Sequence, residues 1–438
     1  MGDWSGFLLD VLIQIPKFLL SPALYIFALL LFWHYHKQVV QERKLFHVRL
    51  TSAPGELLRS LLLGALAGVG VSALLLLFGI ALSYYDVVLL WGISILFALI
   101  NIRFLSFAYS GGFLAIVSVL ARLVPPDGAD GWLGQLLLWL RAVNIPGVLA
   151  LVALLHIAEG LLVQLTPKQG FSPVLIKSQR GRVVGAYVIQ KYWMIPAVLF
   201  VSGVPGGTYA IDASGWWPLF YAGAAALSLL PIPTVIGYAD LAVLSTPQEK
   251  AKQAGRRIML FGILLFVLAW AGVYWLPVAV FGGLLSLLGH EAFRIYGKWQ
   301  RRLYTPLYVQ LKKGVRVLAV VPGSPADEME IITGDVILRI NGREINNKAA
   351  IYLALQRQSA FCKMEVMNRE GHIKYVQRSV YQGDHHQLGL ILAPDVETDE
   401  YVEQGGYNRL FGLFRKVRTR RNNESYEVPF EQGKDVTL

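Results

Sequence analysis

Long apolar runs fill the first three hundred residues, and short alternating runs follow them. A membrane-spanning helix needs about 20 predominantly apolar residues. Runs of this kind lie near 18–35, 60–82, 87–106, 108–124, 143–165, 193–212, 217–238, 258–276 and 277–293. The pattern predicts a polytopic α-helical membrane domain over 1–300 with about seven to nine spans. Two of these runs, 108–124 and 277–293, are short enough to be re-entrant, and 4–15 and 132–140 are expected to be interfacial helices.

Lysine and arginine collect in alternate connections between these runs. They concentrate in 37–59, 166–191 and 250–257, whereas the opposite connections carry Asp86, Asp127, Asp130 and Asp212 and no basic residue. Because cytoplasmic loops are the basic ones in membrane proteins, the three basic segments are expected to face the cytoplasm. Nine crossings then place the N-terminus outside and the C-terminus inside.

Composition narrows the class of protein. Of 438 residues, 55% are hydrophobic and 16% charged, with a formal net charge of +11. In a membrane protein this excess favours anionic lipid headgroups as partners rather than nucleic acid. The N-terminal run lacks a basic region before it and a small-residue cleavage site after it, so it is expected to remain as an anchor. The single cysteine, Cys362, excludes an internal disulfide and a CxxC pair.

The pattern changes after residue 302. Short β-branched runs at 315–321, 335–341, 362–367 and 373–380 predict strands, and 348–358 predicts a short helix. These elements predict a small cytoplasmic α/β domain over 303–394. An acidic linker and a basic, amphipathic or disordered tail are expected over 395–438.

The turns of this domain have a recognisable order. A turn and a proline-initiated helix lie at Gly323, Ser324, Pro325 and Ala326, a tight turn lies at Gly334 and Asp335, and a hairpin turn lies at Asn341 and Gly342. This order resembles the bacterial PDZ domain. The resemblance implies a module that binds an extended peptide, often a free C-terminus, as an added strand beside a helix.

A PDZ carboxylate loop carries a hydrophobic-Gly-hydrophobic pattern, which occurs here after the last expected strand. The expected peptide-binding residues are Leu388, Gly389, Leu390, Ile391 and Leu392 on a strand, with Ile351 and Leu355 on the helix. The alternative is that 388–392 only closes the sheet. His385 and His386 precede this loop and could bind a carboxylate or a metal, or simply be solvated.

Ionisable residues inside a membrane are costly and therefore suggest function. His156 and Glu159 lie three residues apart and can pair, either as a proton relay or metal site or as an internal hydrogen-bonded pair. His290 and Glu291 begin a zinc-protease motif whose second histidine position is Arg294, which cannot bind zinc. We therefore expect no catalytic site, no metal and no cofactor.

Two further patterns concern association. Gly64, Gly68, Gly70 and Gly79 lie in an apolar run, which predicts close helix packing or a homo-oligomer. The segment 407–421 mixes apolar and basic residues and could lie on the cytoplasmic leaflet. The chain ends in Val436-Thr437-Leu438, a sequence that could enter a PDZ groove.

The segments 360–371 and 377–389, together with Glu42 to His47, resemble the MinJ family of bacterial division-site determinants. This resemblance implies a membrane scaffold that links the polar scaffold DivIVA to the division inhibitor MinD. It also implies a multi-pass protein of the cell membrane, enriched at septa and poles. The alternatives are a site-2-protease-like intramembrane metalloprotease or its inactive relative, and a small-molecule transporter.

Overall fold

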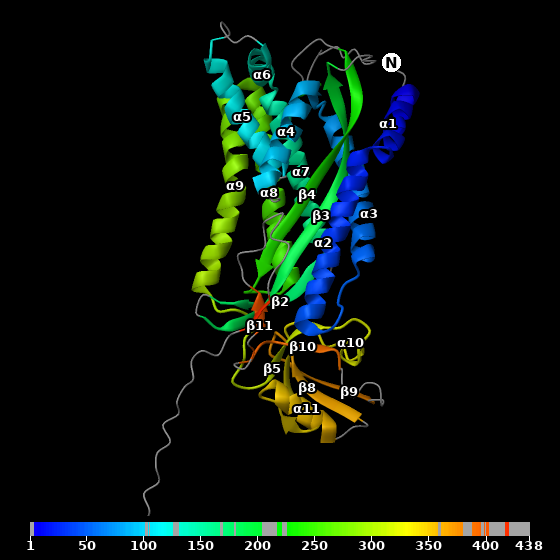
Figure 1. Cartoon of the computed structure of the whole chain (residues 1–438), viewed down its shortest axis with the longest axis vertical. Helices are drawn as coiled ribbons and strands as arrows, with labels where there is room; N and C mark the ends of the chain where they lie inside the picture. The colour runs from blue at the N-terminus through cyan, green and yellow to red at the C-terminus, as the bar shows by residue number, and fades with distance from the viewer. Residues whose placement is uncertain are drawn as a thin grey trace, which may run out of the picture.

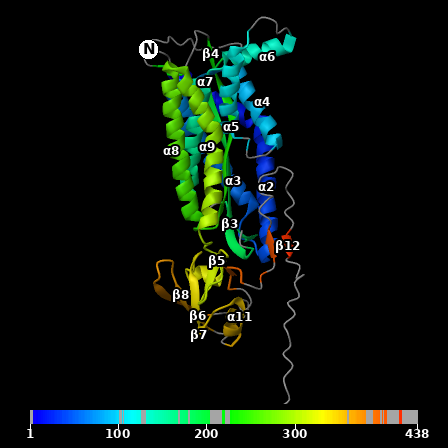
Figure 2. The ribbon, with the colours of Figure 1, turned by 90° about the vertical axis from the view of Figure 1, so that its left-hand side faces the viewer.

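The computed structural model describes residues 4–100, 104, 106–125, 131–166, 170–178, 181–203, 217–220, 226–357, 361–379, 388–395, 398, 400–402 and 417–419. A tall bundle of helices and two long strands occupies residues 4–303, and a small α/β domain lies at one end of it (Figures 1 and 2).

Nine helices of the described part build the bundle. They are α1 (Trp4–Leu19), α2 (Pro22–Phe46), α3 (Ala53–Leu77), α4 (Tyr84–Ile100), α5 (Phe107–Leu123), α6 (Gly131–Ala142), α7 (Ile145–Leu165), α8 (Pro247–Tyr274) and α9 (Leu276–Leu303). Four of them, α3, α7, α8 and α9, are long and apolar enough to cross a membrane, and the bent pair α1–α2 makes up to five. These helices indicate a membrane protein, but they do not confirm seven to nine helical spans.

The main correction concerns the predicted spans at 193–212 and 217–238. Most of the described residues in both segments are strand: β3 (Val183–Ser202) and β4 (Leu227–Ala242) form a long antiparallel ribbon that runs beside the helices (Figure 1). Prolines disfavour a helix in both segments, because a proline inside a helix removes a backbone hydrogen bond. In the ribbon, Pro196 of β3 lies opposite Pro233 of β4. An apolar run alone does not distinguish these two structures.

Strand β4 pairs with one edge of β3, and helix α3 covers the middle of the other edge, from Tyr192 to Val198. Its residues Ser60, Gly64, Gly68 and Ser72 recur every four positions and are buried. Ser60 donates to the carbonyl of Tyr192, and Ser72 Oγ accepts a hydrogen bond from the Val198 amide at 2.9 Å. A Cβ atom on Gly64 would overlap the carbonyl of Met194. Strand edges do not face lipid in membrane proteins. This row of small residues lets α3 cover the β3 edge, so that its backbone groups are not exposed to lipid.

The expected role of the glycines is therefore corrected in part. Gly64 and Gly68 do permit close packing, but against the β3 backbone rather than against a helix. Gly70 has open space around it, and Gly79 lies beyond the end of α3 with a φ of +63°. Helix-to-helix contacts through glycine occur elsewhere, where Gly160 of α7 meets Gly255 of α8.

Helices α4 and α5 form a shorter hairpin inside the bundle. Ser94 of α4 donates to Ser110 of α5 at 2.7 Å, and the carbonyl of Ala108 accepts from Ser286, which lies in the middle of α9. The start of α5 is therefore level with the middle of α9. This hairpin covers only part of the bundle, in keeping with the short run expected at 108–124.

The C-terminal domain consists of a sheet and two short helices. Its elements are β5 (Val315–Val320), α10 (Pro325–Glu328), β6 (Val336–Ile340), β7 (Arg343–Glu344), α11 (Lys348–Arg357), β8 (Phe361–Met367), β9 (Ile373–Ser379) and β10 (Leu390–Leu392). The sheet order is β10-β5-β6-β8-β9, with β7 paired to β6. Gly323, Gly334, Asn341 and Gly342 all have positive φ angles, as the turn pattern predicts.

A second sheet contains the β3–β4 ribbon, with β4 paired to β3, and its strands β2 and β11 lie at the end nearest the C-terminal domain (Figure 1). Its order is β1-β3-β2-β11-β12, where β1 is Ala81–Ser83, β2 is Phe171–Lys177, β11 is Glu400–Val402 and β12 is Val417–Thr419. Part of the expected acidic linker is therefore strand, because β11 pairs with β2 and buries Val402 completely. Apart from residues 395, 398, 400–402 and 417–419, the tail lies outside the described residues, and so does Val436-Thr437-Leu438.

Candidate peptide-binding site and buried polar clusters

The structure contains the two elements expected to flank a bound peptide, β10 and α11. Strand β10 ends the sheet and pairs only with β5 among the described strands, so its other edge is available for an added strand. Helix α11 buries Ile351 and Ala354 in the domain core and leaves Leu355 half-buried beside Leu388, Leu390 and Leu392. The structure thus brings Leu388, Leu390, Leu392, Ile351 and Leu355 into one apolar cluster.

Two of the expected residues have other surroundings. Ile391 alternates with its neighbours and points away from that cluster, toward Tyr308, Leu318 and Ala319. Gly389 has a φ of +77°, and a Cβ atom there would overlap Ser324. Its carbonyl accepts from the Val321 amide at 2.8 Å, which fixes the loop before β10. His385 and His386 lie outside the described residues.

The turn signature stabilises the domain rather than lining the groove. Ser324 caps α10 by accepting from the Asp327 amide, and Ala326 is fully buried. Asp335, also fully buried, accepts from the Ile332 amide at 3.1 Å and pairs with Lys374 Nζ at 2.7 Å. Asn341 holds β8 through the Lys363 amide at 2.8 Å.

An extensive contact between the two domains was not expected from the sequence. The Gly185 amide of β3 donates to the Tyr308 carbonyl at 2.9 Å, and the Leu307 amide donates to the Val243 carbonyl at 2.8 Å. Tyr187 Oη donates to the Leu318 carbonyl inside the C-terminal domain. We call the buried residues here the docking cluster: Leu175, Tyr187, Ile189, Ala242, Tyr308, Leu318, Ala319, Ile391 and Ala393.

An ion pair lies at the edge of this contact. Arg369, in the turn between β8 and β9, reaches Glu249 in the first turn of α8, with Nη1–Oε1 at 2.8 Å and Nη2–Oε2 at 3.0 Å. Hydrogen bonding to Glu249 raises the pKa of Arg369. Glu249 also completes the capping box of α8 with Thr246, so the pair connects the C-terminal domain to the start of a membrane helix.

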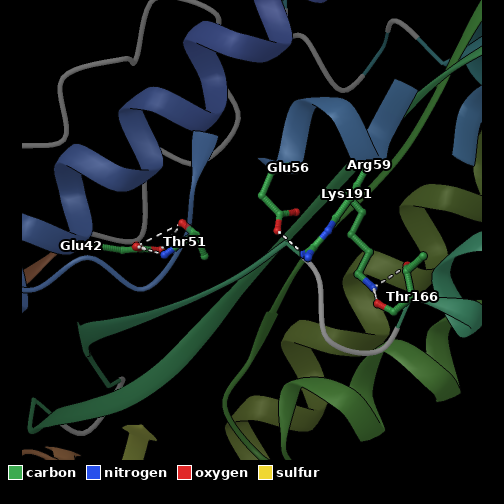
Figure 3. Close-up of polar contacts among 6 residues, drawn as sticks. All are labelled: Glu42, Thr51, Glu56, Arg59, Thr166 and Lys191. Carbon is green, nitrogen blue, oxygen red and sulfur yellow. Dashed lines mark hydrogen bonds and ion pairs between the residues drawn. The ribbon is translucent and has the colours of Figure 1, made fainter. Parts of the chain in front are cut away.

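Buried polar side chains hold the same end of the membrane domain together (Figure 3). Glu42 is 1% exposed and accepts from Thr51 Oγ1 at 3.1 Å, which fixes the connection between α2 and α3. Lys191, expected in a cytoplasmic loop, instead lies within β3 and donates to Thr166 at the end of α7. Arg59 pairs with Glu56 at 3.7 Å. Within the segment from Glu42 to His47, the contacts of Glu42 therefore have a structural role.

The intramembrane histidines form a different pair from the one expected. His156 Nε2 of α7 lies 2.7 Å from His290 Nε2 of α9, and His156 Nδ1 lies 2.7 Å from the Val152 carbonyl. His156 therefore bonds to Val152 and His290 rather than to Glu159. Both His156 and Glu159 are at most 3% exposed, and His156 packs on Phe261. These side chains therefore do not line the water-filled path that a transporter needs.

The interrupted zinc motif is an ion pair in the structure. Arg294 Nε donates to Glu291 Oε2 at 2.8 Å, and Tyr109 Oη donates to Glu291 Oε1 at 3.2 Å. Nowhere in the described part of the chain do three His, Cys, Asp or Glu side chains gather as a metal site. Arg294 thus occupies the position of the second zinc-binding histidine of the motif and pairs with Glu291 there.

Comparison with known proteins adds to this geometry. A PDZ domain model matches residues 316–360, which run from β5 past α11. The cell division topological determinant MinJ of Bacillus subtilis (strain 168) is 27% identical over 407 residues, covering 91% of this chain and 98% of MinJ. This chain resembles MinJ over nearly its whole length. Probable MinJ proteins of Lacticaseibacillus paracasei and Lacticaseibacillus casei (strain BD-II) are each 24% identical over 389 residues, 86% of this chain and 97% of theirs.

The likeness to MinJ extends through both domains. It confirms the resemblance that segments 360–371 and 377–389 suggested, and the PDZ match confirms the class of the C-terminal domain. The match to the PDZ model ends before β8, so it includes α11 but not β10. The peptide-binding assignment of β10 therefore depends on the geometry of the groove.

Proposed function

We propose that this chain is a MinJ-like topological determinant of cell division that acts as a membrane scaffold without catalysing a reaction. The observation that carries the proposal is the similarity to MinJ over 91% of the chain. The groove supports it, because a strand edge beside an apolar helix face binds peptides rather than transforming them. The cell membrane is the proposed location, with enrichment at septa and poles.

The PDZ groove is the proposed site of partner recruitment. An extended peptide would pair with the open edge of β10 and place apolar side chains against Leu355, Leu390 and Leu392. The amides of Leu388 and Gly389 lie at the start of that edge and would receive a terminal carboxylate. The partners that the MinJ resemblance suggests are a DivIVA-like scaffold and a MinD-like division inhibitor, linked through the PDZ domain and the membrane domain.

The proposed orientation places the PDZ domain in the cytoplasm. The basic segments 37–59 and 250–257 lie at the PDZ end of the bundle, where Phe46, Val48 and Leu50 pack on the docking cluster (Figure 1). Basic segments of membrane proteins face the cytoplasm, and anionic headgroups are their proposed lipid partners. A homo-oligomer is also proposed, formed by close packing of lipid-facing helix surfaces.

A matched pair of substitutions on α11 tests recruitment. Leu355 faces the groove and is half-buried, whereas Leu353 is 58% exposed and faces away from it. We expect Leu355→Glu to abolish capture of the division proteins from cross-linked cells, while Leu353→Glu keeps it. The readout is mass spectrometry of proteins that co-purify with each full-length variant. Equal capture by both variants would refute recruitment through the groove.

A further inference from the structure

The strand that offers the peptide-binding edge also seats the PDZ domain on the membrane domain. Leu390 and Leu392 of β10 pack toward α11 and the PDZ core. Ile391 and Ala393 point the other way into the docking cluster, where they are 8% and 4% exposed. One face of β10 therefore belongs to the groove and the other to the interface between the domains.

Within its own sheet, β10 is weakly held. It has three residues, lies at the end of the sheet, and its register with β5 shifts between Ile391 and Leu392. Its flanks are tied by three backbone hydrogen bonds: the Val321 amide donates to the Gly389 carbonyl and the Ala393 amide to the Arg316 carbonyl, both at 2.8 Å, and the Ala326 amide donates to the Leu388 carbonyl at 2.9 Å. Edge segments with few bonds are the first to open locally, so burial of Ile391 and Ala393 against the membrane domain adds to what fixes this strand.

The membrane domain has a surface shaped for this contact. A Cβ atom on Gly185 would lie 2.8 Å from Tyr308 Cβ and 2.9 Å from Leu318 Cδ1, so the docked domain leaves room only for glycine. Tyr187 Oη donates to the Leu318 carbonyl and lies 3.2 Å from Thr333 Oγ1. Tyr308 is fully buried between the two domains. Such a fit holds the PDZ domain in one position.

We infer that the membrane domain positions the peptide-binding strand, so that the PDZ groove is competent only while the PDZ domain is docked through Gly185, Tyr187 and Tyr308. A peptide that binds one conformation loses apparent affinity in proportion to the fraction of molecules in that conformation. Undocking is expected to weaken peptide binding by about 10-fold, within the usual range of coupling between sites. Binding would in turn favour docking by the same factor. The inference rests on the proposed peptide-binding role of the groove.

Hydrogen exchange of the full-length protein in detergent tests the structural part. In Gly185→Leu the new side chain blocks docking, which lowers the free energy of local opening of β10. The amides of 388–393 should therefore exchange at least about 10-fold faster than in the wild type. The amides of β6 and β8 should be unchanged. Gly70→Leu, which adds the same side chain to open space on α3, is the control. Protection of 388–393 equal to that of wild type in a folded Gly185→Leu protein would overturn the inference.

Peptide affinity tests the functional part. A phage library of free C-termini, selected on the intact protein, provides a fluorescent peptide as the probe. We expect Gly185→Leu and Tyr187→Phe to weaken its binding, Gly70→Leu to leave it unchanged, and Leu355→Glu to abolish it. Equal affinity in wild type and Gly185→Leu overturns the coupling and leaves the proposed function intact. If no peptide is selected, or if Leu355→Glu binds normally, the proposed groove itself is wrong, and the coupling fails with it.

Discussion

Ser72 supplies the acceptor that the β3 backbone needs at the level of Val198. The Val198 amide points away from β4 and donates to Ser72 Oγ at 2.9 Å, while Ser72 Oγ donates to the Gly68 carbonyl at 2.6 Å. Ser72 and Val198 are each 8% exposed, so no bulk water replaces a lost partner. Ser72→Ala removes the hydroxyl and leaves a buried N–H unpaired.

The expected loss follows from that unpaired amide. Leaving a buried donor unsatisfied costs about 1–3 kcal/mol. A loss of about 2 kcal/mol lowers the ratio of folded to unfolded protein about 30-fold. For domains of 150–250 residues, 1 kcal/mol corresponds to about 2–4 °C in Tm, so the midpoint should fall by about 4–8 °C.

Ser118→Ala is the matched control for this loss. Ser118 lies in α5, is fully buried, and its hydroxyl has no hydrogen-bond partner among the described residues. Its removal should change Tm by less than about 1 °C, because no bond is lost. Thermal unfolding of both variants in the same detergent, followed by size-exclusion fluorescence, makes the comparison. Equal shifts for Ser72→Ala and Ser118→Ala would refute the claim that α3 seals the strand edge.

Three further predictions concern Gly64 in the α3–β3 contact and Arg369 and Cys362 in the PDZ domain. Gly64→Leu should prevent folding, because its side chain would occupy the position of the β3 backbone, whereas Gly70→Leu on the same helix should fold; yield of monodisperse protein measures both. Arg369→Ala should lower stability by only about 0.2–1 kcal/mol, because its pair with Glu249 is partly exposed, and a larger loss in denaturant titration would contradict this. Burial raises the pKa of the Cys362 thiol to about 11, so maleimide should label the native protein slowly and the unfolded protein at once.

Local turn chemistry explains why the PDZ domain could be predicted from the sequence. Asn341 and Gly342 require positive φ angles, and Ser324 with Pro325 starts a helix, whatever surrounds them. The choice of β10 and α11 as the proposed walls of the groove followed from short-range pattern as well. The orientation of Ile391 did not, because it depends on a surface contributed by a strand about two hundred residues earlier.

The ribbon β3–β4 shows where the sequence pattern fails. Its apolar runs have the length of a helical span, and in β3 burial on both faces removes the alternation that marks a strand. The prolines at 196, 231 and 233 were the available signal against a helix. The glycines at 64 and 68 indicated a close approach, but the identity of the neighbour depends on tertiary structure. The same holds for Gly185, a single glycine whose role appears only when Tyr308 is beside it.

The position of the protein in dividing cells tests the central claim most directly. A fluorescent fusion of the full-length chain, imaged beside a membrane dye and a division-ring marker, should collect at septa and at new poles. Deletion of 303–394 in the same fusion then separates targeting by the PDZ domain from targeting by the membrane domain. The account predicts septal enrichment of the full-length protein above the membrane dye. Uniform membrane fluorescence of the full-length protein throughout division would contradict it.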